Sequence, residues 1–245
     1  MNAALLERLV LFREQHGLET AETFLGQKIR YQYATLKRRK RALPFLQEIY
    51  TTKTVLALLL VEARAAKEYW RAYGKNIAGH AAWHSRKPHA PDPCNQLLDI
   101  GYHYLTGYLS KLFAELNIPT ELGLFHRAQS AKAHPLVYDF MEWLRPLLVD
   151  RVILVFFKKK KRVLQRITGR EVGLVIVRIK KELERRYYHK KLDYCITLTY
   201  WIKLIALELE KSIRHNTAFE PIFPSLRHET RCKKPRLHTQ NGAKD

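Results

Sequence analysis

The sequence predicts an all-α fold, a set of packed helices followed by a basic, disordered tail. Apolar residues recur at steps of three and four, for example at Val55, Leu58, Leu59 and Ala66. The run with the highest strand propensity, residues 152–157, has no second strand with turn residues nearby to pair with it. An apolar fraction of 47% with only 10 Gly and 10 Pro leaves little room for linkers, so the 245 residues predict one folded domain.

Two helices are predicted at the start of the chain. The first covers residues 3–12, and Gly17 would close it because glycine suits the left-handed position that follows a helix. The second covers about residues 19–41 and includes Phe24 and Ile29 on its apolar side. Five consecutive cations form its last turn or the loop after it.

The middle of the chain contains several start and stop signals for helices. Pro44 interrupts the pattern, and a long helix is predicted from about residue 45 to 73, where Gly74 would end it. Asp92 is a predicted N-cap, with a proline at the first helical position after it. A later helix is expected to restart after Pro146, because proline lacks the amide proton that a helix interior needs.

Three helices and a tail are predicted in the last part of the chain. Residues 152–157 are assigned to a helix because they lack a strand partner, and residues 170–188 and 193–215 are amphipathic helices. The final residues are basic and polar without periodicity, which is typical of disorder. The sequence therefore predicts a helical domain over residues 1–222 and a disordered tail over residues 223–245.

The net charge of +21 predicts a polyanionic partner, and nucleic acid is favoured over a membrane surface. The apolar runs are far shorter than the roughly 20 residues that a spanning helix needs. Glu7 and Arg8 also interrupt what would be the apolar part of a secretion signal. We therefore expect a cytoplasmic protein without membrane contact.

The candidate DNA-binding cations form two clusters. Neighbouring cations are costly to bring together unless they are solvated or neutralised by an anion, so the alternatives are a solvated surface and a phosphate clamp. We favour the clamp in a chain this basic. The residues expected to contact DNA are Lys37, Arg38, Arg39, Lys40 and Arg41, then Lys158, Lys159, Lys160, Lys161 and Arg162, together with Arg145.

A second pattern indicates a metal site. Asp139 and Glu142 are three residues apart on one predicted helix face, with Arg145 one turn further on and His126 in a turn before them. Glu62 is the best candidate for a further ligand, because an ionised group on an apolar face is rarely buried without a partner. The alternatives are a half-exposed Glu62 paired with Arg or Lys, and an Arg145 that only pairs with the acidic residues. Carboxylates with one imidazole suit Mg²⁺ or Mn²⁺.

Four ordered motifs carry a resemblance to a known family. They are EARAAKEYW at residues 62–70, DPCNQLLDIGY at 92–102, GLFH at 123–126 and LVYDFMEWLRP at 136–146. Together they resemble the catalytic domain of the CRISPR-associated spacer-acquisition endonuclease and integrase, the first of the numbered Cas proteins.

The resemblance implies a helical catalytic domain with one Mg²⁺ or Mn²⁺ site. Its ligands would be Glu62, His126 and Glu142, with Asp139 at a nearby acidic position of the catalytic set. The implied reaction is DNA cleavage and strand transfer that inserts spacer DNA into a CRISPR array.

The implied partners are double-stranded and branched DNA and the second, small CRISPR-associated acquisition protein. Members of this family usually begin with a β-rich domain that helps them dimerise, and this chain starts almost at the helical domain, so we expect at most a weak homodimer. The rival hypotheses are a transposon-type integrase of the same catalytic family and a basic DNA-binding scaffold without catalysis.

Overall fold

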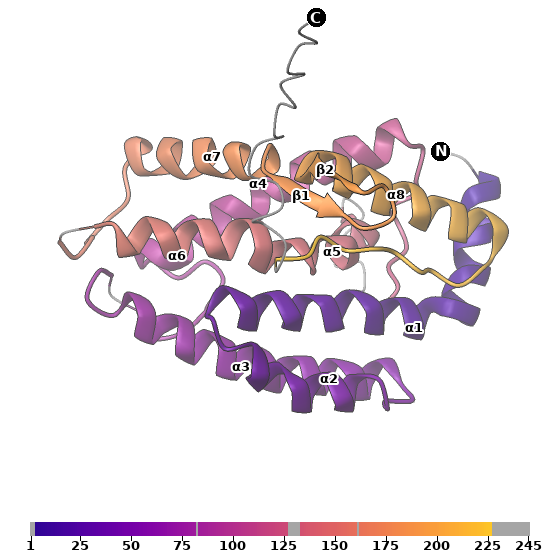
Figure 1. The fold of residues 1–245 in the computed structure, drawn as a ribbon, viewed down its shortest axis with the longest axis horizontal. Coiled ribbons are helices and arrows are strands. Elements are labelled where there is room, and N and C mark those ends of the chain that lie inside the picture. The colour runs from indigo at the N-terminus through magenta and orange to yellow at the C-terminus, as the bar shows by residue number, and fades with distance from the viewer. Residues whose placement is uncertain (1–2, 82, 127–132, 161, 227–245) are drawn as a thin grey trace, which may run out of the picture.

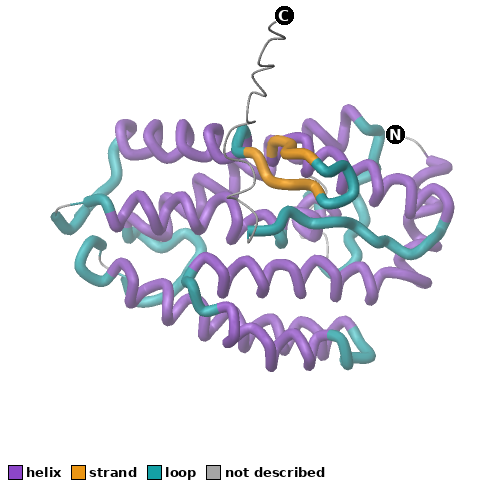
Figure 2. Tube along the Cα trace, viewed as in Figure 1, coloured by secondary structure: helices purple, strands orange, loops and turns teal. Residues whose placement is uncertain are grey.

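A computed structural model describes residues 3–81, 83–126, 133–160 and 162–226, which form packed helices and one small sheet (Figures 1 and 2). This confirms the predicted all-α class. The helices are α1 (Ala3–Thr35), α2 (Leu43–Ile49), α3 (Val55–Ile77), α4 (Pro93–Glu115), α5 (Pro135–Met141), α6 (Arg151–Lys158), α7 (Gly169–Leu183) and α8 (Leu198–His215). A 3-10 turn (Arg39–Ala42), a π-helical turn (Arg145–Asp150) and the strands β1 (Arg186–His189) and β2 (Tyr194–Thr197) complete the described elements.

Helix α1 is the central element of the fold. In Figure 1 it runs along the molecule, with α2 and α3 on one side and α5 and α6 on the other. Leu9, Phe12 and Phe24 are buried in the main core, whereas Leu25 and Ile29 belong to a second apolar cluster shared with α2 and α3. A side chain on α1 can therefore meet residues from both layers.

Helix α1 is continuous, so the predicted break at Gly17 is wrong. Gly17 lies inside the helix, and none of the described glycines has a positive φ. Glycine costs about 1 kcal/mol in a helix, which is less than the roughly 1.5–3 kcal/mol gained by burying each of Phe12 and Phe24 on either side of it. The helix ends at Thr35, earlier than predicted, and Lys37 takes a left-handed conformation (φ 58°).

The predicted helix over residues 45–73 is two helices separated by a turn. Thr54 begins the second one as its N-cap, and the Thr54 hydroxyl accepts a hydrogen bond from the backbone N–H of Ala57 (3.2 Å). Gly74 does not end this helix but lies within it. A Cβ at Gly74 would overlap the indole of Trp83, so this glycine permits a close approach instead of a helix end.

The predicted helices 170–188 and 193–215 are shorter than expected, because their neighbouring ends form an antiparallel hairpin. Tyr187 pairs with Ile196 in this hairpin, and Asp193 takes a left-handed conformation (φ 53°) in the turn. The aromatic and β-branched residues of these two segments favour strands. The apolar residues on both sides of the hairpin recur at helical spacing, so the short switch to the two-residue period of a strand was not recognised.

Other local predictions are confirmed. Residues 152–157 lie within α6, and Asp92 caps α4 by accepting a hydrogen bond from the backbone N–H of Asn95 (2.9 Å). Of the predicted tail, residues 227–245 lie outside the described part of the chain. None of the helices in the described part is both long enough and apolar enough to cross a membrane.

Candidate metal centre

Glu62 is positioned by α3 at the edge of a buried stripe. Leu58, Val61 and Tyr69 on the same helix face the core, and the Glu62 side chain is 17% exposed. Its Oε1 lies 2.6 Å from Nζ of Lys28 on α1. Glu62 therefore does pair with a lysine, as one of the two alternatives expected. This lysine belongs to a buried cluster and not to the solvated surface.

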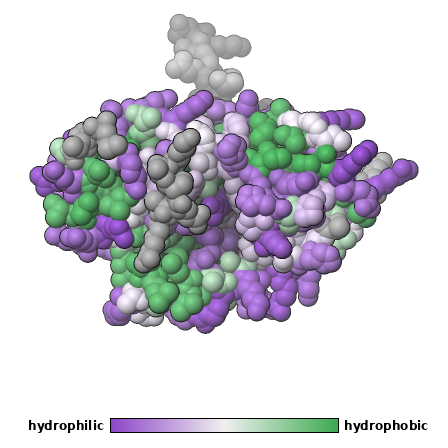
Figure 3. All heavy atoms as spheres, turned by 180° about the vertical axis from the view of Figure 1, so that it is seen from behind, coloured by the Kyte–Doolittle hydropathy of each residue, from purple (hydrophilic) through white to green (hydrophobic). Residues whose placement is uncertain are grey.

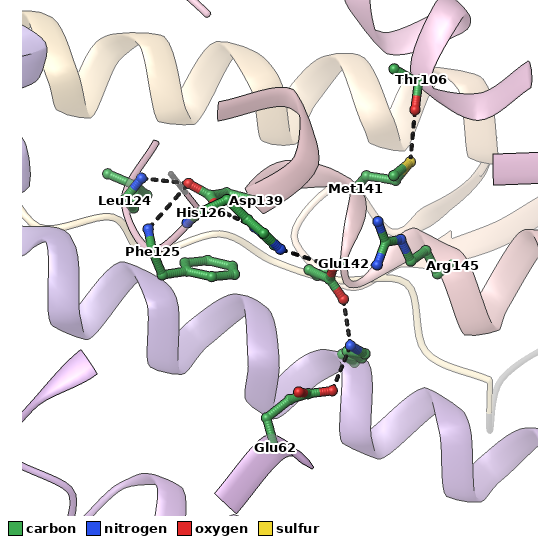
Figure 4. A network of polar contacts seen from close by, with 10 residues as sticks. Glu62, Thr106, Leu124, Phe125, His126, Asp139, Met141, Glu142 and Arg145 are labelled. Atoms are coloured by element: carbon green, nitrogen blue, oxygen red, sulfur yellow. Dashed lines mark hydrogen bonds and ion pairs between the residues drawn. The ribbon is translucent and has the colours of Figure 1, made fainter. Parts of the chain in front are cut away.

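Asp139 organises the turn that carries His126. The Asp139 carboxylate is fully buried and accepts hydrogen bonds from the backbone N–H groups of Leu124, Phe125 (3.4 Å) and His126 (3.0 Å). It also lies 2.6 Å from Nδ1 of the His126 ring (Figure 4). Burial raises the pKa of Asp139, and the hydrogen bonds from His126 and the backbone partly offset this effect.

The contact with Asp139 fixes which nitrogen of His126 is available. A carboxylate accepts hydrogen bonds, so Nδ1 is the nitrogen that donates in this contact, and Nε2 is the nitrogen whose lone pair can bind a metal ion. Nε2 lies 3.8 Å from Oε1 of Glu142. Asp139 thus acts on the site through His126, as a residue that positions the imidazole.

Glu142 lies where α5 ends and the chain turns towards Arg145. Its side chain is only 2% exposed, and it lies 2.5 Å from both Nζ of Lys28 and Nη1 of Arg145. Burial acts to raise the pKa of Glu142, but the charges of Arg145 and Lys28 outweigh it and hold the pKa at about 2. Glu142 is therefore an ionised carboxylate at neutral pH.

Lys28 is the residue of this cluster that the sequence analysis missed. Its ammonium lies between the carboxylates of Glu62 and Glu142, and its side chain is 12% exposed. Burial acts to lower the pKa of Lys28, but the attraction of the two carboxylates outweighs it and raises the pKa. Lys28 lies on the buried side of α1, between Phe24 and Tyr31. A charged residue on an apolar helix face is also the pattern that identified Glu62.

A pocket of about 270 Å³ is lined by Glu62 and by Lys28 and Arg145, the two cations that pair with Glu142. The guanidinium groups of Arg86 and Arg145 lie over the ring of Tyr102, 5.4 and 5.1 Å from its centroid. The lining residues with charged or aromatic side chains are Lys28, Glu62, Trp70, Arg86, Tyr102, Arg145 and the buried Asp150. Cations from three separate elements of the chain thus face a space beside the carboxylates, which suits a phosphate group.

Glu62, His126 and Glu142 point towards one another in Figure 4, although they come from three separate segments. Among the described residues, no group of three or more His, Cys, Asp or Glu side chains is close enough to hold a metal ion. The ammonium of Lys28 instead lies between the two carboxylates, which shows that this point favours positive charge. Two carboxylates and an imidazole Nε2 are a donor set that fits Mg²⁺ or Mn²⁺.

The cations of the cluster at residues 37–41 are all exposed. Arg39, Lys40 and Arg41 lie in a 3-10 turn and not in the last turn of α1. No side-chain hydrogen bond caps this turn at Arg38. This cluster therefore presents its charge to solvent, as a phosphate clamp requires.

The second cluster, at residues 158–162, is more strongly engaged within the protein. Lys158 donates a hydrogen bond to Asn76 Oδ1 (2.8 Å), and Lys160 forms an ion pair with Glu171 (3.1 Å). Lys161 lies outside the described residues. Lys159 and Arg162 are exposed.

Gly123 keeps the His126 turn close to Asp139, and its replacement provides a local test of this arrangement. A Cβ at this position would overlap the backbone carbonyl oxygen of His126 and would lie 2.9 Å from Oδ2 of Asp139. We expect Gly123→Ala to destabilise the fold by about 1–3 kcal/mol, the usual cost of overpacking. Urea denaturation measures this change.

The matched control for this substitution is Gly107→Ala. Gly107 lies within α4, and a Cβ there would meet no other atom within 4 Å. We expect it to stabilise the protein by about 0.5–1 kcal/mol, because alanine is the better helix former. A Gly123→Ala protein as stable as wild type would contradict the tight packing of the turn.

Comparison with known proteins shows which family this chain is similar to. The family model described as CRISPR associated protein Cas1 matches residues 4–190. The chain is 27% identical over 154 residues to CRISPR-associated endonuclease Cas1 1 of Saccharolobus solfataricus. That match covers 58% of this chain and 44% of the relative, so the chain spans less than half of the relative's length.

Two solved structures share the fold. A casposase bound to an integration product superposes with a TM-score of 0.76 at 18% identity, over 91% of this chain and 73% of that one. A Cas6-RT-Cas1–Cas2 complex contains a chain that superposes with a TM-score of 0.68 at 18% identity, over 84% of this chain and 25% of that one.

Proposed function

Because the chain belongs to the family of the CRISPR associated protein Cas1, we propose that it is a metal-dependent DNA endonuclease and integrase that inserts spacer DNA into a CRISPR array. The resemblance that the four sequence motifs indicated is thereby confirmed. The observation that carries the proposal is that Glu62 and Glu142 share the ammonium of Lys28, while Nε2 of His126 lies 3.8 Å from the other oxygen of Glu142.

Glu62, Glu142 and Nε2 of His126 would hold Mg²⁺ or Mn²⁺. When bound, such an ion polarises a phosphoryl oxygen and neutralises the charge that develops on the phosphate during attack by water or a DNA 3′-hydroxyl. Asp139 holds the imidazole in the orientation that leaves Nε2 free. Arg145 bridges the two parts of the site, because it pairs with Glu142 and also lines the adjacent pocket.

The pocket gives the proposed substrate a place beside these ligands. Its cations, Lys28, Arg86 and Arg145, suit a phosphate of the DNA backbone, and the indole of Trp70 offers an aromatic surface for a base or sugar. The exposed cluster at residues 37–41 would hold DNA further along the backbone. We propose double-stranded and branched DNA as the substrate.

The partners are proposed on two observations. One similar structure is a complex whose name includes Cas2, which supports the second, small acquisition protein as a partner of this chain.

Figure 3 shows hydrophobic surface at the edge where Figure 1 places α2 and α3, and Leu43, Leu56 and Leu60 are more than half exposed there. This apolar surface is our candidate contact for a weak homodimer.

Strand transfer tests the proposed function most simply. A labelled oligonucleotide with a free 3′-hydroxyl is incubated with the protein, a plasmid that carries a CRISPR repeat, and MnCl₂ or a chelator. We expect joining of one DNA end with manganese and none with the chelator. Insertion of both ends needs two catalytic centres, so we expect it only when two copies are brought together.

Two outcomes would contradict the proposal. DNA binding without any joining in MnCl₂ or MgCl₂ would favour the non-catalytic scaffold. Joining that requires terminal inverted repeats on the donor, and ignores the CRISPR repeat in the target, would favour the transposon-type integrase.

A further inference from the structure

The ammonium of Lys28 lies where positive charge is needed most. It is 2.6 Å from Oε1 of Glu62 and 2.5 Å from Oε2 of Glu142, and both of these carboxylates are largely buried. Without this ammonium, Glu62 would lose its ion pair and only Arg145 would remain paired with Glu142, which is destabilising in a desolvated site. Lys28 therefore stabilises the site in the absence of any added ion.

The same position conflicts with metal binding. A hard divalent cation binds carboxylate oxygens at about 2.0–2.1 Å. An ion held between Glu62 and Glu142 would lie beside the ammonium of Lys28, which contacts Oε1 of Glu62 and Oε2 of Glu142, and two cations so close together repel each other strongly. The ammonium must leave at least one carboxylate before an ion can bind to both.

The fold provides a place for the displaced side chain. Lys28 lines the pocket of about 270 Å³ that Glu62 also lines. The ammonium of a lysine is carried on a flexible four-carbon stem, so it can move into such a pocket. In this pocket the ammonium would lie near the carboxylate of Asp150 as well as Arg86 and Arg145, next to the proposed phosphate position.

We propose that Lys28 is a built-in competitor of the divalent cation, a positioning residue that holds Glu62 and Glu142 together and is displaced when the metal binds. This inference rests on the proposed metal centre and goes beyond it. According to this inference, the metal affinity of the site depends on the exchange of the Lys28 ammonium for a divalent cation.

Isothermal titration calorimetry with MnCl₂, in the absence of DNA, tests the exchange. We expect Lys28→Met and Lys28→Gln to bind Mn²⁺ about tenfold more tightly than wild type, the factor gained when one charge-assisted hydrogen bond no longer has to be broken. The matched control is Lys67→Met, which removes one charge from the exposed side of α3 and is expected to leave the affinity unchanged.

Glu62→Gln separates this inference from the proposed function. If Glu62→Gln weakens Mn²⁺ binding while both Lys28 variants bind like wild type or more weakly, the competition is refuted and the metal centre stands. If Glu62→Gln and both Lys28 variants bind Mn²⁺ as tightly as wild type, or if none of these proteins, wild type included, binds Mn²⁺, the competition and the metal centre are both refuted.

Folding of the Lys28 variants is followed by circular dichroism in metal-free buffer. Lower thermal stability than wild type that MnCl₂ restores supports the exchange, because the metal then replaces the lost ammonium. A Lys28 variant that unfolds and does not recover its helical signal on addition of MnCl₂ contradicts it.

Discussion

Replacing Glu142 by glutamine is expected to reduce metal-dependent DNA cleavage and strand transfer by about a thousandfold or more. Loss of a charged ligand removes several kcal/mol of charge stabilisation in the transition state, and each 1.36 kcal/mol corresponds to a factor of ten in rate. Glu142 is the most buried of the three proposed ligands and is the carboxylate that lies near His126, Lys28 and Arg145 together. Rates measured on a branched DNA substrate in MnCl₂ test this expectation.

The same substitution also leaves buried cations without their partner, so folding has to be measured beside activity. Removal of one member of a buried ion pair typically costs about 3–5 kcal/mol. Activity is therefore compared below the melting temperature of the variant, with DNA binding measured in parallel. Glu48→Gln on α2 is the matched control, because Glu48 is exposed and its ion pair within the described part of the chain is with the exposed Arg64. A folded Glu142→Gln protein that cuts DNA as well as the Glu48→Gln protein would refute the role of Glu142.

The second large effect is expected in DNA binding. Replacing Arg39, Lys40 and Arg41 together by glutamine should weaken binding to duplex DNA by about two orders of magnitude at low salt, because each phosphate contact that is lost also removes counterion release. The slope of the logarithm of the binding constant against the logarithm of salt should become shallower by about 0.9 for each lost contact, or about 2.7 in total. Fluorescence anisotropy at a series of salt concentrations measures both quantities.

A control with the same change in charge distinguishes the cluster from the overall charge of +21. Lys111, Lys203 and Lys211 are exposed on α4 and α8 and are separated along the chain. Replacing these three by glutamine is expected to change the salt slope much less. Equal effects of the two triple variants would show that the 3-10 turn is not a DNA clamp.

The candidate site was largely accessible from the sequence because its residues break a local pattern. Glu62 is a carboxylate beside an apolar helical stripe, and Asp139 and Glu142 recur at helical spacing after His126, so each could be selected before the structure was known. The ion-pair partners of these residues could not be predicted from the sequence. Contacts between residues 34 positions apart or more, such as the pair of Lys28 with Glu62, depend on how α1 packs against α3, which the periodicity of one helix does not contain.

The errors in the fold come from residues that have more than one structural role. Gly17 and Gly74 resembled helix ends, but one lies within a helix that buried phenylalanines stabilise and the other makes room for Trp83. The hairpin was missed because Tyr187 and Ile196 fit the apolar pattern of the adjoining helices as well as that of a strand. In each case tertiary packing decided between local conformations that the sequence allowed.

The most direct test of the metal centre is the anomalous scattering of Mn²⁺ in crystals of the protein grown with MnCl₂. A peak is expected about 2.1 Å from carboxylate oxygens of Glu62 and Glu142 and from Nε2 of His126, with Lys28 moved away from at least one of the carboxylates. A peak at another position would contradict the assignment of these residues as the metal centre, and a peak at the expected position with Lys28 still in contact with both carboxylates would refute only the exchange.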